Sequence, residues 1–247
     1  MMIQASIDEI FASMQGEGPR VGERHIFVRF QGCDIRCRYC DTVAALKPVG
    51  GTCRAQKRSG SFDHEQVQNP LTADRLTALC TRLKVRGPSK PVLSLTGGEP
   101  LLQQEFLSAW LPLVRPGFRV YLETNGILFS ALQDLAGLID VVSMDIKLPS
   151  ATGLRPYWEE HRKFLAAALG TECFAKTVVT NDTVQEDILT AAAVLAEVDC
   201  SIPLIIQPAS GAHAPLPSML LDFQDAVLCI LADVRIIPQA HKILQVP

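Results

Sequence analysis

Three cysteines stand close together in the N-terminal part of the chain. Cys33, Cys37 and Cys40 follow a Cys-x3-Cys-x2-Cys spacing. This spacing puts three thiolates on one short loop, where they can converge on one metal centre. Thiolates are the usual ligands of iron–sulfur clusters and are also common ligands of zinc. The loop therefore predicts a metal centre, and the number of ligands decides which kind.

Three thiolates are one fewer than a cubane 4Fe-4S cluster takes. A cluster held by these cysteines leaves one iron open to a small molecule. S-adenosylmethionine (SAM) fits that position, because its amine and carboxylate can chelate the iron. The pairing of SAM with an iron–sulfur centre is a known source of radical chemistry. The spacing is the signature of radical SAM enzymes, and the chain resembles that superfamily here.

A zinc site is the alternative explanation of the same cysteines. Cys53 lies in a polar loop and could supply the fourth ligand. By contrast, Cys80, Cys173 and Cys229 stand in apolar periodic stretches, so we expect them to be small core residues.

Regularly spaced apolar segments must position this loop. Seven of them read as strands and alternate with segments of helical periodicity. The predicted strands are 25–30, 91–96, 119–123, 140–145, 174–180, 202–207 and 234–237. The predicted helices are 71–85, 103–114, 130–138, 157–169, 184–198 and 218–232.

This alternation predicts an α/β fold with a mostly parallel sheet covered by helices. Periodicity alone does not separate an open doubly wound sheet from a partial barrel. The cysteine motif favours a partial (β/α)6 TIM-type barrel, in a single domain that spans residues 1–247. Residues 47–70 are rich in Gly, Lys, Arg, Ser, Asn and Gln, and we interpret them as a polar surface insertion of unassigned role.

Polar motifs follow the ends of several predicted strands. In barrel-type folds the carboxyl ends of the strands form the rim on which active sites are built. Gly97 and Gly98 would let a ligand approach the backbone, and Glu99 could accept a hydrogen bond from a ligand ammonium. The alternative is a plain strand-to-helix turn.

Two further polar motifs also lie at the carboxyl ends of predicted strands. Glu123 and Asn125 could bind ribose hydroxyls, or could simply form an Asn-Gly turn beside an exposed carboxylate. Strand alternation puts Ser143, Asp145 and Lys147 on one side. That side faces either the site or only the end of the barrel.

The composition excludes several classes of protein. The chain has 247 residues, 48% of them hydrophobic, and a net charge of -3. This balance gives no reason to expect a nucleic-acid or membrane partner. We find no signal peptide and no apolar run long enough to span a bilayer. These features predict a cytoplasmic protein with reduced thiols.

The remaining motifs narrow the resemblance to one family. They are the stretch Glu9–Gly18, Arg29, the cysteine loop with Asp41 and Thr42, residues 96–100, residues 123–126 and the terminal segment His241–Pro247. With these motifs the chain resembles the 7-carboxy-7-deazaguanine synthase family from Glu9 to Pro247. It departs from the family in the polar loop 43–69. It also has Ser-Met-Asp-Ile-Lys at 143–147, where many members have Ser-Pro-Lys. Which of these five residues contacts SAM is left open.

The resemblance implies a role for each matching residue. Cys33, Cys37 and Cys40 would hold a 4Fe-4S cluster, and Thr42 would ligate Mg²⁺; by itself, Thr42 could simply cap the turn after Cys40. The residues implied to bind SAM are Gly98, Glu99, Glu123, Ser143, Asp145, Lys147, Gln207, Pro208, Ala209 and Ser210. The residues implied to bind the substrate are Met14, Gln15, Gly16, Glu17, Arg29, Thr96, His241 and Pro247.

One of the implied substrate ligands is the C-terminal residue of the chain. Pro247 would offer its free carboxylate to the substrate. Untethered ends usually fray. Ile243, Leu244 and Val246 give this segment apolar side chains, so we expect it to dock against the rim.

The resemblance also implies an activity. A family member contracts the ring of 6-carboxy-5,6,7,8-tetrahydropterin to 7-carboxy-7-deazaguanine with release of ammonia, and uses SAM catalytically. It takes its electron from an external donor of the flavodoxin or ferredoxin type and forms a homodimer. Two alternatives remain open. One is a radical SAM enzyme that activates a glycyl-radical enzyme, and the other is a zinc-stabilised binding module without catalysis.

Overall fold

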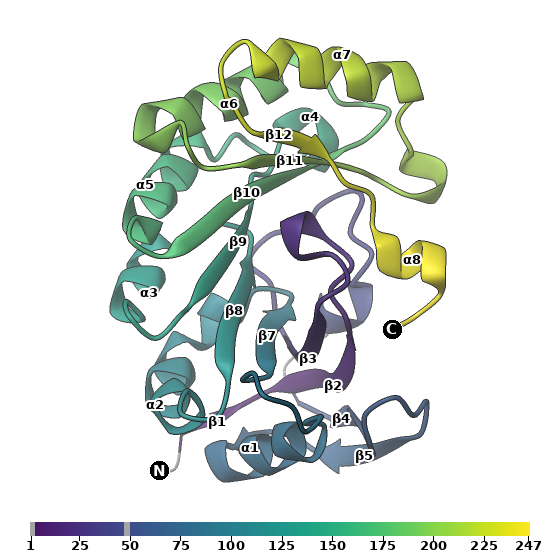
Figure 1. The fold of residues 1–247 in the computed structure, drawn as a ribbon, viewed down its shortest axis with the longest axis vertical. Helices are drawn as coiled ribbons and strands as arrows, with labels where there is room; N and C mark the ends of the chain where they lie inside the picture. Colours follow the sequence, from purple (N-terminus) through teal and green to yellow (C-terminus); the bar gives the residue numbers. More distant parts are fainter. Residues whose placement is uncertain (1–2, 47–49) are drawn as a thin grey trace.

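The computed structural model describes residues 3–46 and 50–247 (Figure 1). Within them, one ten-stranded sheet runs through the molecule in the order β12-β11-β10-β9-β8-β7-β3-β2-β4-β5. Its seven parallel strands are β3 (Arg24–Phe30), β7 (Val92–Gly97), β8 (Arg119–Thr124), β9 (Val141–Asp145), β10 (Glu172–Val179), β11 (Leu204–Pro208) and β12 (Val234–Ile236). These are the seven predicted strands, and the mostly parallel α/β fold is confirmed. β12 and β5 are the two ends of the sheet, so the barrel is partial.

Three further strands lengthen the sheet beyond β3. β2 (Ile7–Met14) is antiparallel to β3, β4 (Thr52–Gln56) is parallel to β2, and β5 (His64–Gln68) closes a hairpin with β4. The predicted insertion at 47–70 therefore contains an edge hairpin of the sheet. Residues 47–49 lie outside the described part. The short strands β1 (Gln4–Ala5) and β6 (Leu71–Thr72) form a separate pair.

Helices cover the outer face of the parallel strands. The α-helices are α1 (Ala73–Arg82), α2 (Gln104–Val114), α3 (Phe129–Asp134), α4 (Pro149–Thr152), α5 (Trp158–Ala168), α6 (Gln185–Asp199), α7 (Pro217–Leu228) and α8 (Ala240–Leu244). The 3-10 turns are η1 (Gly18–Arg20), η2 (Val43–Leu46), η3 (Pro100–Gln103) and η4 (Gly211–His213). In Figure 1, α2, α3, α5, α6 and α7 follow one another around one side of the sheet, while α8 lies on the other side. We did not predict the short helices α4 and α8.

The core lies between the sheet and this outer row of helices. β9 is buried along its whole length, and its last residue, Asp145, is buried as well. A buried carboxylate needs partners of its own, because taking its charge out of water is costly. We therefore expect polar groups close to the Asp145 carboxylate at the end of β9. In the described part of the chain, no helix has the length and apolarity that a bilayer crossing requires.

Candidate active site

A cavity of about 420 Å³ opens at the carboxyl ends of the parallel strands. Its wall includes side chains from the loop after β2, from the cysteine loop, from the ends of β7 to β11 and from the C-terminal segment. Segments far apart in the sequence meet here because neighbouring parallel strands end at the same edge.

Most of the predicted site residues line this cavity. They are Met14, Gln15, Gly16, Glu17, Arg29, Cys33, Cys37, Cys40, Thr42, Thr96, Gly98, Glu123, Asp145, Lys147, Gln207, Ala209, Ser210, His241 and Pro247. Three predicted residues do not line it: Glu99, Ser143 and Pro208. Ser143 is buried within β9, and Pro208 ends β11 between two residues that do line the wall.

The three cysteines are half-buried and carry free thiols. Burial raises the pKa of Cys33 to about 11 and also raises the pKa of Cys37. Without a cation Cys33 and Cys37 are neutral thiols, whereas coordination to a metal deprotonates a thiol. The loop therefore fits a metal or cluster whose positive charge stabilises the thiolates.

The Gly-Gly turn after β7 packs directly against this cysteine loop. The Glu99 amide donates to the Gly32 carbonyl at 2.8 Å, and the Gly98 amide donates to the Phe30 carbonyl at 3.1 Å. A Cβ atom at position 98 would overlap the Gly32 carbonyl and lie 3.0 Å from the Cβ of Cys33. Glycine is needed at position 98 because only a residue without a side chain permits this approach.

Glu99 has hydrogen-bond partners within the protein. Its carboxylate accepts hydrogen bonds from the amides of Leu101 at 3.0 Å and Asn125 at 2.8 Å, and from the Thr124 hydroxyl at 2.9 Å. Burial raises the pKa of Glu99 to about 7. The Glu99 carboxylate is fully buried and bonded in this way, so it ties the Gly-Gly turn to the next strand end. A contact between Glu99 and SAM stays a prediction.

The zinc alternative does not fit this geometry. Cys53 is on β4, fully buried in the hydrophobic core, and is not part of the cavity wall. Among residues 3–46 and 50–247, no three His, Cys, Asp or Glu side chains are arranged to hold a single metal ion. In a cubane each cysteine binds a different iron, so its thiolates need not meet at one ion.

A chain of four charged side chains lies on the cavity wall. Lys147 Nζ lies 2.9 Å from Asp145 Oδ2, Lys176 Nζ lies 2.8 Å from the same oxygen, and Lys176 Nζ lies 3.0 Å from Glu17 Oε2. Burial alone would lower the pKa of both lysines, but the facing carboxylates hold both above their usual value. Burial also opposes ionisation of Asp145 and Glu17, yet the lysines keep both pKa values low. All four groups are therefore charged near neutral pH.

Glu123 lies beside residues that we assigned to the substrate. It accepts hydrogen bonds from Gln15 Nε2 at 2.8 Å and from Thr96 Oγ1 at 2.7 Å. Burial, together with the nearby charge of Glu17, raises the pKa of Glu123. Glu123 is therefore bonded to two of the predicted substrate residues, while its contact with SAM stays a prediction.

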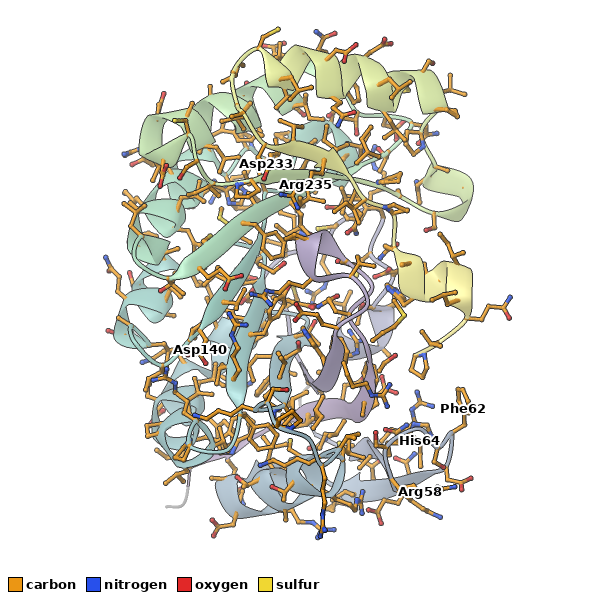
Figure 2. All side chains as sticks on the ribbon, in the orientation of Figure 1. Arg58, Phe62, His64, Asp140, Asp233 and Arg235 are labelled. Atoms are coloured by element: carbon orange, nitrogen blue, oxygen red, sulfur yellow. The ribbon has the colours of Figure 1, made fainter. Side chains whose placement is uncertain are left out.

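Three buried polar atoms of the cavity wall lack a hydrogen-bond partner within the described residues. They are Tyr39 Oη, Asp145 Oδ1 and Gln207 Oε1. Buried polar atoms are nearly always bonded, so unpaired atoms in a cavity call for a polar ligand. A fourth such atom is Nε2 of His64, which is labelled in Figure 2. His64 is on the β4–β5 hairpin and is not part of the cavity wall.

The C-terminal segment closes one side of the cavity. Lys242 Nζ lies 2.6 Å from Asp41 Oδ2, next to the last cysteine, and Gln239 Nε2 donates to Glu17 Oε1 at 2.7 Å. Burial opposes ionisation of Asp41, but Lys242 holds its pKa well below the usual range. These contacts join the chain's end to both the cysteine loop and the loop after β2.

His241 and Pro247 reach the cavity from this segment. The His241 ring lies against Gly16, where any Cβ atom would overlap it, and the Ala240 amide donates to the Gly16 carbonyl at 2.8 Å. We expected apolar side chains to dock the segment. Val246 is half-buried, but Ile243 and Leu244 are 69% and 60% exposed, so the segment is held mainly by polar contacts.

Several residues of the wall were not predicted. They are Phe11, Phe27, Ile35, Tyr39, Asp41, Leu46, Thr124, Lys176, Val178, His213, Gln239 and Lys242. The rings of Phe11 and Phe27 stack at 5.0 Å, and the Arg29 guanidinium lies 5.6 Å from the centre of the Phe11 ring. For Lys176 the sequence did hold a signal, since a lysine interrupts the apolar strand 174–180.

Comparisons with known proteins match most of the chain. The radical SAM superfamily model matches residues 27–189. A 7-carboxy-7-deazaguanine synthase from Geobacter sulfurreducens is 40% identical over 244 residues, which cover 97% of each protein. The protein of the same name from Methanopyrus kandleri is 33% identical over 242 residues, 97% of this chain and 93% of that protein. The crystal structure of QueE from Escherichia coli has a TM-score of 0.62 and 20% identity, covers 96% of this chain and 95% of that one, and shows a similar fold.

Proposed function

The chain belongs to the 7-carboxy-7-deazaguanine synthase family of radical SAM enzymes, and from this we propose its reaction. It contracts the ring of 6-carboxy-5,6,7,8-tetrahydropterin to 7-carboxy-7-deazaguanine with release of ammonia, in queuosine-type 7-deazapurine biosynthesis. One observation carries the proposal. The three cysteines share a single cavity with Gln15, Glu123 and the C-terminal Pro247.

The cysteine side of the cavity fits the cofactors. Cys33, Cys37 and Cys40 would hold a 4Fe-4S cluster, which together with SAM supplies the radical that starts the reaction. The unpaired acceptors Asp145 Oδ1 and Gln207 Oε1 can take hydrogen bonds from donors on SAM. The neighbouring residues proposed to line the SAM position are Gly98, Lys147, Ala209 and Ser210.

A second group of wall residues fits a carboxylated pterin. Glu123, Gln15 and Thr96 form a hydrogen-bonded group that can accept from the amino and ring N–H groups of a pterin. Arg29 lines the same wall, and a guanidinium fork suits a substrate carboxylate. These residues orient the substrate and, with the C-terminal segment, shield it from water.

The proposed magnesium site is tested by Thr42→Ala. Thr42 follows Cys40 by two residues and lines the cavity. Its hydroxyl group donates a hydrogen bond to Asp41 Oδ1 at 3.1 Å. Magnesium takes oxygen ligands and keeps several waters, so the substrate carboxylate can complete the set. We expect the Mg²⁺ concentration for half-maximal stimulation to rise by about tenfold or more, with SAM affinity unchanged.

The matched control for this variant is Ser218→Ala. Ser218 is exposed on α7 and is not part of the cavity wall. Titration of activity with Mg²⁺ and equilibrium binding of SAM are measured for all three proteins. An unchanged magnesium requirement in Thr42→Ala would show that the ion binds elsewhere.

The proposed reaction is tested against the glycyl-radical activase alternative by identifying the product. With SAM, a reductant and the carboxytetrahydropterin, we expect 7-carboxy-7-deazaguanine and ammonia. An activase would instead cleave SAM without changing the pterin. A flavodoxin- or ferredoxin-type electron donor, a homodimer and a cytoplasmic location remain predictions.

A further inference from the structure

Lys176 occupies an unusual position on the cavity wall. It is in the middle of β10, and its side chain is only 10% exposed. Its ammonium lies 3.0 Å from Glu17 Oε2 and 2.8 Å from Asp145 Oδ2. It therefore joins the loop after β2 to the end of β9, two segments that share no strand pairing.

A lysine at this position is costly for folding. The residues two positions before and after it, Phe174 and Val178, share its face of β10 and are apolar and buried. Buried ion pairs are often no more stable than apolar residues of the same volume, because each charge loses its hydration. Stability alone therefore does not explain a lysine here, and its place on the cavity wall favours a functional explanation.

Lys176 neutralises two carboxylates, those of Glu17 and Asp145, but only one of them has a second cation nearby. Asp145 has a second cation, since Lys147 lies 2.9 Å away. Within the described residues, Lys176 is the one cation in ion-pair contact with Glu17. Loss of the Lys176 charge should therefore affect Glu17 much more than Asp145.

Glu17 in turn positions two groups of the substrate side. Its backbone amide donates to Gln15 Oε1 at 3.0 Å, while Gln15 Nε2 donates to Glu123 at 2.8 Å. The Glu17 side chain accepts from Gln239, the residue just before α8. A displaced Glu17 would therefore disturb both the Gln15–Glu123 pair and the C-terminal segment.

We propose that Lys176 is a positioning residue for the pterin: it fixes Glu17 and thereby orients the substrate side of the cavity. This inference rests on the proposed function. It predicts that loss of the Lys176 charge weakens binding of the pterin much more than binding of SAM. The reason is that Lys147 still neutralises Asp145 on the SAM side when Lys176 is replaced.

The test variant is Lys176→Met, which keeps the length of the side chain and removes its charge. Equilibrium binding of SAM and of the carboxytetrahydropterin is measured on the reconstituted holoenzyme, with KM and kcat. We expect the pterin dissociation constant and KM to rise by about tenfold or more, as for a lost charge-assisted contact. We expect the SAM dissociation constant to change by less than about threefold. Lys163→Met, at an exposed position on α5, is the control.

A double-mutant cycle tests the link through Glu17. If Lys176 acts by neutralising Glu17, Glu17→Gln should weaken pterin binding strongly in the wild-type background and little in the Lys176→Met background. Independent, additive losses would overturn the proposal. If Lys176→Met does not fold, Lys176→Gln takes its place in both experiments with the same expected results.

Two other results would overturn the proposal. One is wild-type pterin affinity in folded Lys176→Met, and the other is an equal loss of SAM and pterin binding, which indicates a general structural role. Absence of pterin binding to the wild-type holoenzyme would instead contradict the proposed function itself, so the two failures are distinguishable.

Discussion

Replacement of Cys37 by alanine is expected to abolish iron–sulfur content and SAM cleavage while leaving the fold largely intact. Three thiolates hold three of the four irons of the cluster and leave the fourth open to SAM, so the loss of one breaks the set. The loop has no spare cysteine to replace it, because Cys53 is in the core on β4. Cys37 is half-buried on a loop and not part of a strand, so its loss removes little packing. Iron, sulfide and 5′-deoxyadenosine are measured after anaerobic reconstitution.

The control for this variant is Cys200→Ala. Cys200 is exposed at the C-terminal end of α6 and does not line the cavity. It should keep the iron and sulfide content of the wild type. If Cys37→Ala cleaves SAM at the wild-type rate, the cluster assignment is wrong. Zinc without sulfide in the wild-type protein would also contradict it.

An extension added after Pro247 is expected to weaken substrate binding strongly while SAM binding is kept. Pro247 lines the cavity, and its ring fixes φ and stiffens the end of the chain. The extension removes the free carboxylate from this position without deleting a side chain. A carboxylate acceptor in a partly dry pocket contributes roughly 1.5–3 kcal/mol. The affinity for the pterin should therefore fall by about tenfold to hundredfold.

The same extra residues attached to the N-terminus provide the control, because β1 near that end is not part of the cavity wall. Binding of pterin and SAM is measured for both tagged proteins. The Lys242–Asp41 pair should still hold α8 in the extended protein, so a loss limited to the pterin identifies the carboxylate. Turnover equal to that of the native chain would show that Pro247 is not a substrate ligand.

The parallel sheet could be predicted because its strands are apolar and interrupted at regular intervals. Two parts of the sheet could not. β2 (Ile7–Met14) carries Asp8 and Glu9 among its apolar residues, so its period is obscured. The β4–β5 hairpin is polar and lies at the sheet edge, where exposed strands lack a strong hydrophobic pattern.

The site could be predicted where its residues directly follow strands, as the cysteines and Gly98 do. Contacts between distant segments could not, because they depend on how the sheet curves. The Lys242–Asp41 and Lys176–Glu17 pairs are of this kind. Glu99 shows a further limit: a motif shows that a carboxylate stands at a turn, but not whether it faces the cavity or the backbone.

The most direct test of the assigned function is an anaerobic turnover assay with 6-carboxy-5,6,7,8-tetrahydropterin, SAM, Mg²⁺ and a reductant. The products are identified by mass, and ammonia and residual SAM are quantified. We predict 7-carboxy-7-deazaguanine and ammonia in equal amounts, with more product formed than SAM consumed. If the reconstituted protein cleaves SAM and leaves the pterin unchanged, the assigned function is contradicted.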